Sequence, residues 1–222
     1  MGVPVLLIGS SGSGKSTSLR NFEPEEVGIF NVASKPLPFR KKLKKIDGAT
    51  YETIAQGLQV TALNTYIIDD AGYLMTFESF DKALEKGYEK FTINAKNFSD
   101  MVRFVIKELP NDTIVYFIMQ TDVSADGITK ARTIGKMIDD VLCLEGLFTI
   151  TLLSKYDDGH YKFITQTEGT TIAKSPMEMF DKEIDNDLKL VDDTIRDYWS
   201  LPKRKKLVAK ATTNKTKEEK GE

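Results

Sequence analysis

A glycine-rich stretch near the start of the chain has the residue types and spacing that bind nucleotide phosphates. Residues 9–17 fit the pattern of a glycine, any four residues and then Gly-Lys-Ser. Glycine lets backbone N–H groups approach phosphate oxygens, Lys15 can reach the β- and γ-phosphates, and the Ser16 hydroxyl can ligate Mg²⁺. The expected phosphate-binding residues are Gly9, Ser10, Ser11, Gly12, Ser13, Gly14, Lys15, Ser16 and Thr17.

The segments on either side of this stretch provide the context that a phosphate site needs. The apolar residues 3–8 predict a buried strand, and residues 15–21 predict a helix. The N-terminus of that helix would add free N–H donors and the positive end of a dipole. A flexible Ser/Gly loop that binds nothing is the alternative, and the flanking strand and helix argue against it.

Two carboxylates follow a second apolar run. Residues 65–68 predict a strand that ends in Asp69 and Asp70, and we expect this strand to lie next to the strand of residues 3–8. Asp69 would then hold Mg²⁺ through water, while Ser16 ligates the ion directly. Asp70 is the nearest candidate to orient and deprotonate the attacking water. It could equally cap the helix that follows, and both interpretations stay open.

A polar side chain also ends the most apolar run of the chain. Residues 113–119 are continuously apolar and rich in β-branched types, which is typical of a strand covered on both faces. Gln120 follows, at the edge of the sheet where the other strands also end. We predict that Gln120 senses the γ-phosphate or positions water. A strand-end amide bonded only to backbone is the alternative.

Composition excludes several other kinds of site. The 222 residues contain one cysteine, Cys143, and one histidine, His160, so an internal disulfide and a His-rich metal site are impossible. Cys143 lies in an apolar run and is expected to be buried. The guanine-binding pattern Asn-Lys-x-Asp is absent, which favours ATP over GTP. No run of eighteen apolar residues and no cleavable signal is present, so we expect a cytoplasmic location without membrane association.

The order of the predicted elements indicates an α/β fold. Strands alternate with helices in the first half, and the second half is richer in strands, with a hairpin predicted over residues 147–155 and 160–166. We therefore predict a mostly parallel sheet flanked by helices, with an antiparallel hairpin at one side. Other predicted elements are a helix over residues 71–90 with Leu74, Phe77, Phe80 and Leu84 on one side, a helix over residues 97–109, a strand over residues 141–145 and a helix over residues 183–199.

The chain is expected to form one domain and a tail. Residues 1–200 have the length and composition of a single globular domain. Residues 201–222 carry eight Lys and Arg and three Glu, so the tail has a charge of +5 within a chain whose net charge is −2. We predict that this tail is disordered and that its cations are available to contact phosphates.

Taken together, these motifs resemble the phage-encoded, RecA-like ATPases of the AAA family, including those associated with single-strand annealing and recombination. The similar stretches are residues 9–17, 35–39, 67–70, 118–121, 146–149 and 173–177. The resemblance implies a P-loop NTPase fold that binds ATP and Mg²⁺ through Lys15, Ser16, Thr17 and Asp69. It also implies a role in phage DNA recombination or replication, alongside a single-strand-binding protein or another protein of these processes.

The resemblance further implies an assembly. Proteins of this kind form homo-oligomers with ATP between neighbouring subunits, and they bind single-stranded DNA through loops that correspond to residues 121–136 and 167–176. The cations of these loops are Lys130, Arg132, Lys136 and Lys174. Lys174 is the first candidate for a cation that stabilises the γ-phosphate of the neighbouring subunit during catalysis.

One departure from the family pattern keeps other functions open. The family places a catalytic glutamate after the second strand, but residues 31–35 contain no acid. A DNA-dependent ATPase remains the first hypothesis. A nucleotide-switched loader or regulator of a replication protein, with little hydrolysis of its own, is the second. A small-molecule or nucleotide kinase is the third.

Overall fold

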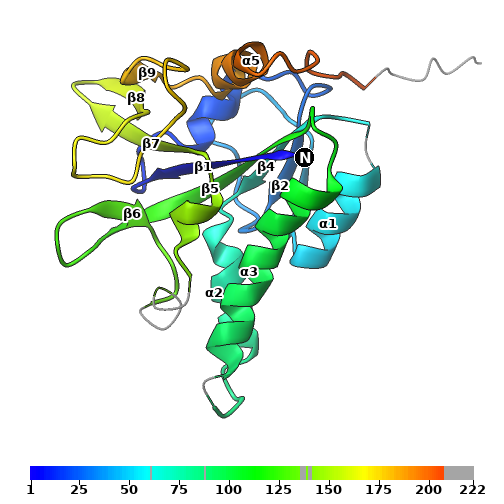
Figure 1. Cartoon of the computed structure of the whole chain (residues 1–222). Coiled ribbons are helices and arrows are strands. Elements are labelled where there is room, and N and C mark those ends of the chain that lie inside the picture. The colour runs from blue at the N-terminus through cyan, green and yellow to red at the C-terminus, as the bar shows by residue number, and fades with distance from the viewer. Residues whose placement is uncertain (61, 88, 136–138, 140–141, 208–222) are drawn as a thin grey trace, which may run out of the picture.

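The computed structural model describes residues 1–207 except residues 61, 88, 136–138, 140 and 141 (Figure 1). The strands are β1 Val3–Gly9, β2 Gly28–Asn31, β3 Lys45–Asp47, β4 Thr65–Asp69, β5 Ile114–Val123, β6 Thr129–Ala131, β7 Ile150–Asp157, β8 His160–Ile164 and β9 Glu183–Asp185. The helices are α1 Tyr51–Val60, α2 Gly72–Asp81, α3 Glu89–Glu108 and α5 Leu188–Tyr198, with the 3-10 helices η1 Ser16–Asn21 and η2 Leu144–Leu147.

The described strands form one mixed sheet in the order β3-β2-β4-β5-β1-β7-β8-β9, with β6 paired to the far end of β5. The strands from β3 to β7 in this order run parallel to one another. The β7–β8, β8–β9 and β5–β6 pairs are antiparallel. The prediction of a mostly parallel α/β sheet with an antiparallel hairpin at one side is therefore confirmed.

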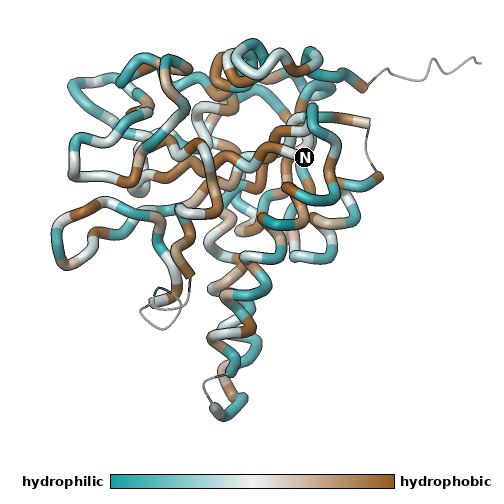
Figure 2. Tube along the Cα trace, in the orientation of Figure 1, coloured by the Kyte–Doolittle hydropathy of each residue, from teal (hydrophilic) through white to brown (hydrophobic). Residues whose placement is uncertain are grey.

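Helices cover both faces of the sheet, so its central strands are buried on both sides. In β1, Leu6 and Ile8 join the core beneath α1, α2 and α3, whereas Val5 and Leu7 join the core beneath η1 and α5. Figure 1 shows these two helical layers on opposite sides of the strands. Figure 2 shows apolar residues concentrated along the strands and polar residues on the outer turns. This double cover explains the uninterrupted apolar runs of the sequence.

The strand order corrects one expectation. The strand that ends in Asp69, β4, does not lie next to β1, because β5 lies between them. The ten-residue β5 carries six consecutive buried residues and takes the central position of the sheet. Since β1, β4 and β5 are parallel, their carboxyl ends still reach the same edge.

Two helix boundaries also differ from the prediction. The helix expected over residues 71–90 ends at Asp81, and the one expected from residue 97 already begins at Glu89. Leu74 is buried as predicted, but Phe80 is 70% and Leu84 98% exposed. Figure 1 shows why, since the ends of α2 and α3 that are joined to each other extend well beyond the sheet. The periodicity of residues 71–90 therefore did not mark a buried face.

The region around Cys143 and the last helix required smaller corrections. A strand was predicted over residues 141–145, but η2 begins at Leu144, and residue 141 lies outside the described residues. Cys143 is exposed instead of buried, whereas Leu144 is buried in the core and Leu142 and Leu147 pack against it. Residues 183–199 contain the short strand β9 before α5 begins.

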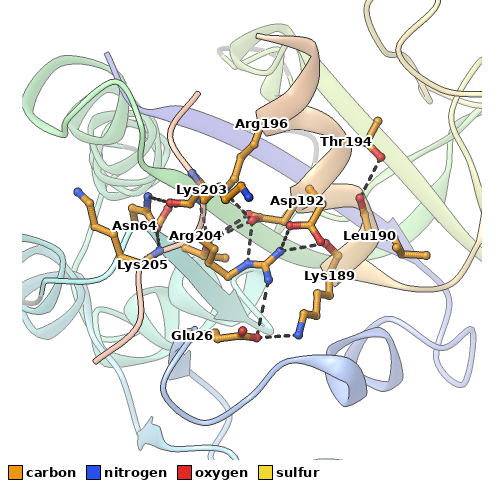
Figure 3. Close-up of polar contacts among 12 residues, drawn as sticks. Glu26, Asn64, Lys189, Leu190, Asp192, Thr194, Arg196, Lys203, Arg204 and Lys205 are labelled. Atoms are coloured by element: carbon orange, nitrogen blue, oxygen red, sulfur yellow. Dashed lines mark hydrogen bonds and ion pairs between the residues drawn. The ribbon is translucent and has the colours of Figure 1, made fainter. Parts of the chain in front are cut away.

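Residues 201–207 pack against the body, contrary to the predicted disorder (Figure 3). The Arg204 guanidinium, 6% exposed, lies 3.0 Å from Asp192 and 2.6 Å from Asp193. Burial raises the pKa of Glu26, but hydrogen bonds from Lys189 and Lys206 outweigh it and hold that pKa at about 2. Local composition could not reveal these contacts, because Glu26 belongs to a distant segment and the contacts with Asp192 and Asp193 require the chain after α5 to pack back on that helix. Residues 208–222 lie outside the described residues.

Within the described part of the chain, no helix is long and apolar enough to cross a membrane.

Candidate functional site

The carboxyl edge of the parallel strands gathers most of the predicted site. Gly9 at the end of β1 is the register partner of Gln120 in β5. Asp69 at the end of β4 is the register partner of Asn31 at the end of β2. The glycine loop (residues 9–17) begins at this edge, so its residues lie close to the polar side chains that follow β4 and β5.

The glycine loop folds tightly around its own lysine. Lys15 is buried, and its Nζ donates to the carbonyl oxygens of Gly9 and Ser10, each at 2.8 Å. Gly12 and Gly14 have φ angles of 79° and 96°, which favour glycine. Burial lowers the pKa of the Lys15 ammonium, while nearby carboxylates raise it. The loop thus holds a cation among backbone groups, as a phosphate site requires.

The hydroxyl of Ser13 supports this interpretation. The Ser13 Oγ is buried and has no hydrogen-bond partner in the described part of the chain, which costs about 1–3 kcal/mol. The loop around it is held firmly, because the Ser13 carbonyl accepts a 2.7 Å bond from Ser154, which in turn accepts from Asn186. A phosphate group has the acceptor oxygens that this hydroxyl lacks, so the loop fits the nucleotide that its sequence predicts.

The helix after the loop is weaker than predicted. Only the six residues of η1 are helical, and they form a 3-10 helix. The Ser-Thr-Ser start favours local side-chain bonds over an α-helix, and the chain leaves the helix at Phe22, shortly before Pro24. A helix this short has a small dipole, so the backbone N–H groups and Lys15 would have to provide most of the attraction for a phosphate.

The two residues predicted to hold Mg²⁺ are in direct contact. The Ser16 hydroxyl donates to Asp69 Oδ1 at 3.0 Å. Burial, and secondarily the charge of Asp70, raises the pKa of the Asp69 carboxyl to about 6. A divalent cation would favour its ionised form. No cluster of three His, Cys, Asp or Glu is placed to hold a metal among the described residues, so phosphate oxygens and water would supply the other ligands.

Asp70 does not cap the following helix. The N-cap residue of α2 is Ala71, which has no side-chain capping bond, and Asp70 has a φ angle of 57°. Its carboxylate instead forms an ion pair with the Lys35 ammonium at 2.9 Å. The same Lys35 Nζ lies 4.8 Å from the centre of the Tyr73 ring. The hydrogen bond to Asp70 raises the pKa of Lys35.

Sequence reasoning missed Lys35 as a site residue. Asn31, at the end of β2, donates from Nδ2 to the Lys35 carbonyl at 2.7 Å and fixes the backbone there. Because β2 and β4 are neighbouring parallel strands, the segment after β2 must pass close to Asp70. The stretch of residues 35–39 was singled out for its resemblance alone, and the neighbour relationship that assigns Lys35 to the site requires the strand order.

Gln120 lies within β5 and not at its end. The strand continues to Val123, and the Gln120 carbonyl accepts a 2.7 Å bond from the Arg132 backbone in the β5–β6 hairpin. Its side chain donates to the Tyr73 hydroxyl at 3.4 Å, so the amide is not simply bonded to backbone. The Gln120 side chain therefore connects β5 to the beginning of α2.

A cavity of about 510 Å³ adjoins these residues. It runs along α2 and is closed on the other side by the β5–β6 hairpin and the residues that follow it, and Asp70, Tyr73, Gln120, Asp122 and Arg132 are part of its wall. Arg132 has no acidic partner within the described ranges. Within these ranges, Arg132 is therefore a cation without an acidic partner, and it lines the same cavity as the predicted catalytic residues Asp70 and Gln120.

The two loops predicted to bind DNA touch one another. Thr129 in β6 donates from its backbone to the Thr170 carbonyl at 2.9 Å and accepts from Ile172 at 3.1 Å. Lys130 is ion-paired with Asp139 at 2.7 Å. Of the predicted loop cations, Lys130 is therefore neutralised within the chain, and Lys136 lies outside the described residues.

Lys174 lies apart from the glycine loop of its own chain. Its backbone exchanges two hydrogen bonds with Thr151, of 2.8 and 2.9 Å, near the beginning of β7. The glycine loop contacts the other half of β7, through Ser154. Since Lys174 is not part of the site assembled here, its predicted role would require a second subunit.

No family model matches the chain, and no curated protein resembles it at a significant level.

Proposed function

We propose that this chain is a Mg²⁺-dependent ATPase with a RecA-like P-loop core that acts in phage DNA recombination or replication. The observation that carries the proposal is the contact of Ser16 with Asp69 beside a loop that buries Lys15. These residues lie far apart in the sequence, and their contact supports the proposal because a triphosphate and its metal need a cation, a hydroxyl and a carboxylate side by side.

In this proposal the chain's own groups change partners when the nucleotide binds. Lys15 leaves the carbonyls of Gly9 and Ser10 for the β- and γ-phosphates, and the Ser13 hydroxyl gains an acceptor. Ser16 and Asp69 would hold Mg²⁺, which would supply positive charge next to the phosphate oxygens. Gln120 and Asp70 orient the attacking water, since both line the adjoining cavity.

The decisive experiment measures ATP hydrolysis by the purified chain with and without single-stranded DNA. We expect multiple turnover that DNA stimulates and that Lys15→Ala lowers at least 100-fold, because the lost ammonium stabilises transition-state charge. Lys41→Ala is the matched control, since Lys41 is ion-paired with Glu23, outside the site described above. Unchanged hydrolysis in Lys15→Ala would show that the site is assigned wrongly.

A homo-oligomer with ATP between subunits accounts for the position of Lys174. Mass measurement with a non-hydrolysable ATP analogue should show assembly. A mixing experiment then tests the role of Lys174, because Lys174→Ala and Lys15→Ala subunits are each inactive alone. In a mixed assembly, the Lys174→Ala subunit supplies an intact glycine loop and the Lys15→Ala subunit supplies an intact Lys174 at the same interface. Activity should therefore return. Absence of recovery despite mixed assembly would exclude a role across the interface.

A nucleotide-switched loader or regulator is the second candidate, and the Lys35–Asp70 ion pair favours it. The pair occupies the carboxylate that would orient water, and residues 31–35 offer no glutamate to replace it. This function predicts tight ATP binding with less than one turnover per hour, whereas rapid turnover by the chain alone would exclude it.

A further inference from the structure

Two tyrosines of the β7–β8 hairpin lie beside the glycine loop, and the proposed chemistry uses neither. Tyr161 packs directly on the loop, since a Cβ atom added to Gly14 would lie 2.5 Å from Cδ1 of its ring. Tyr156 is its cross-strand partner, and the two ring centroids are 4.7 Å apart. Tyr161 is 40% exposed and Tyr156 54% exposed.

The loop and the hairpin are joined in a second place. Ser154, near the end of β7, donates to the Ser13 carbonyl at 2.7 Å and is itself fixed by Asn186. Tyr156 follows Ser154 on the same strand. The aromatic pair is therefore held in a set position relative to the loop that would bind the phosphates.

The strand order indicates which end of a nucleotide would face this pair. The groups that would hold the metal and orient water, Asp69, Asp70 and Gln120, follow or belong to β4 and β5, on one side of β1. The γ-phosphate must lie on that side. The α-phosphate and the nucleoside then leave the loop toward the other side of β1, which is formed by β7 and β8.

The geometry points to Tyr161, supported by Tyr156, as the surface on which the base of the nucleotide stacks. This inference rests on the proposed function and adds the recognition of the base to it. An aromatic face attracts any nucleobase through its π-system, and a purine covers more of it than a pyrimidine does. The site therefore takes purine nucleoside triphosphates, and stacking by itself discriminates weakly between adenine and guanine.

The experiment compares a ligand that has a base with one that has none. Calorimetric titration of the full chain with Mg·ATP and with Mg·tripolyphosphate measures both affinities. Alanine substitution of a stacking residue costs about 1–3 kcal/mol per base, so Tyr161→Ala should weaken ATP binding about 5- to 150-fold. Binding of tripolyphosphate should change less than twofold, and Tyr161→Phe should resemble the unmodified chain for both ligands.

Three further variants make the test specific. Tyr161→Leu keeps an apolar cover over Gly14 but lacks the π-face, so it should lose ATP affinity as Tyr161→Ala does. Tyr198→Ala, on α5, removes a tyrosine of similar exposure, 42%, and should change neither affinity. Lys15→Ala should weaken the binding of both ATP and tripolyphosphate.

Two outcomes would overturn the inference. Equal losses for ATP and tripolyphosphate in Tyr161→Ala and Tyr161→Leu would show that Tyr161 only supports the loop. Unchanged ATP affinity in both variants would show that the base lies elsewhere. If the unmodified chain binds neither ligand, the proposed function itself fails, which is a different result from either of these.

Discussion

The ammonium of Lys35 lies 2.9 Å from the carboxylate of Asp70, next to the contact of Asp69 with Ser16. The first residue of this pair follows β2 and the second follows β4, and the two strands are neighbours in the sheet. Because a carboxylate engaged by a cation is a poorer hydrogen-bond acceptor for water, this pair would restrain Asp70 in its proposed role of orienting the attacking water.

Removal of the Lys35 side chain should therefore raise ATP turnover. We expect Lys35→Ala to increase kcat about two- to fivefold, since Asp70 is then free to accept from water. Asp70→Asn should lower kcat about 100-fold, in the range of a lost general base. The double variant should match Asp70→Asn, and Lys41→Ala should leave kcat unchanged. A drop in kcat for Lys35→Ala would instead place Lys35 on the phosphates.

The buried carboxylate of Asp69 makes stability depend on pH. Its pKa is raised to about 6, above the usual value of 3.8, so the folded chain binds more protons than the unfolded chain between these values. The contribution of Asp69 is therefore most favourable below pH 4 and decreases as pH rises to about 6. We expect Asp69→Asn to raise the free energy of unfolding by about 3 kcal/mol at pH 7 without nucleotide, but not at pH 4. Urea denaturation at pH 4 and at pH 7 measures this free energy for the variant and for the unmodified chain.

Asp69→Asn should impair the use of Mg²⁺ although it stabilises the fold. Asparagine keeps the shape of Asp69 but lacks the charge that Mg²⁺ requires, so the Mg²⁺ concentration for half-maximal turnover should rise at least tenfold. Ser16→Ala should act in the same direction. Asp100→Asn, at an exposed ion pair with Lys96 on α3, serves as the control. An unchanged Mg²⁺ requirement in both variants would contradict the assignment of the metal ligands.

The buried ion pairs of Arg204 should make the last described residues important for stability. Arg204→Ala leaves Asp192 with Arg196 as its remaining cation in a buried position, and we expect a loss of about 1.5–3 kcal/mol. Lys203→Ala is the matched control, because that side chain is exposed and only its carbonyl is bonded. Urea denaturation compares the two. A loss below 1 kcal/mol would mean that residues 201–207 do not anchor the body.

Arg132 should contribute to any DNA contact of the β5–β6 hairpin. It is a cation of the cavity wall without an acidic partner in the described part of the chain, so it is available to a phosphate. We expect Arg132→Ala to weaken single-stranded DNA binding and to reduce the slope of log affinity against log salt by about 1. Lys96→Ala, on α3, should leave the slope unchanged. An unchanged slope for Arg132→Ala would exclude the contact.

The sequence by itself determined the local parts of this protein. These parts are the spacing of residues 9–17, the apolar runs of β1, β4 and β5, and the turn between β7 and β8. Each is determined by residues that are close together in the sequence. Such patterns can be read from the sequence because backbone geometry sets their periods. They predicted the mostly parallel α/β sheet, and they predicted Ser16 and Asp69 as a pair.

Only the tertiary structure decided which distant segments meet. The strand β5 lies between β1 and β4, and Lys35 pairs with Asp70, 35 residues away. Arg204 is buried beside Glu26, which lies near the other end of the chain. The packing of Tyr161 on Gly14 is a further case. Contacts of this kind depend on strand order and on the registers between strands, which local periodicity does not specify.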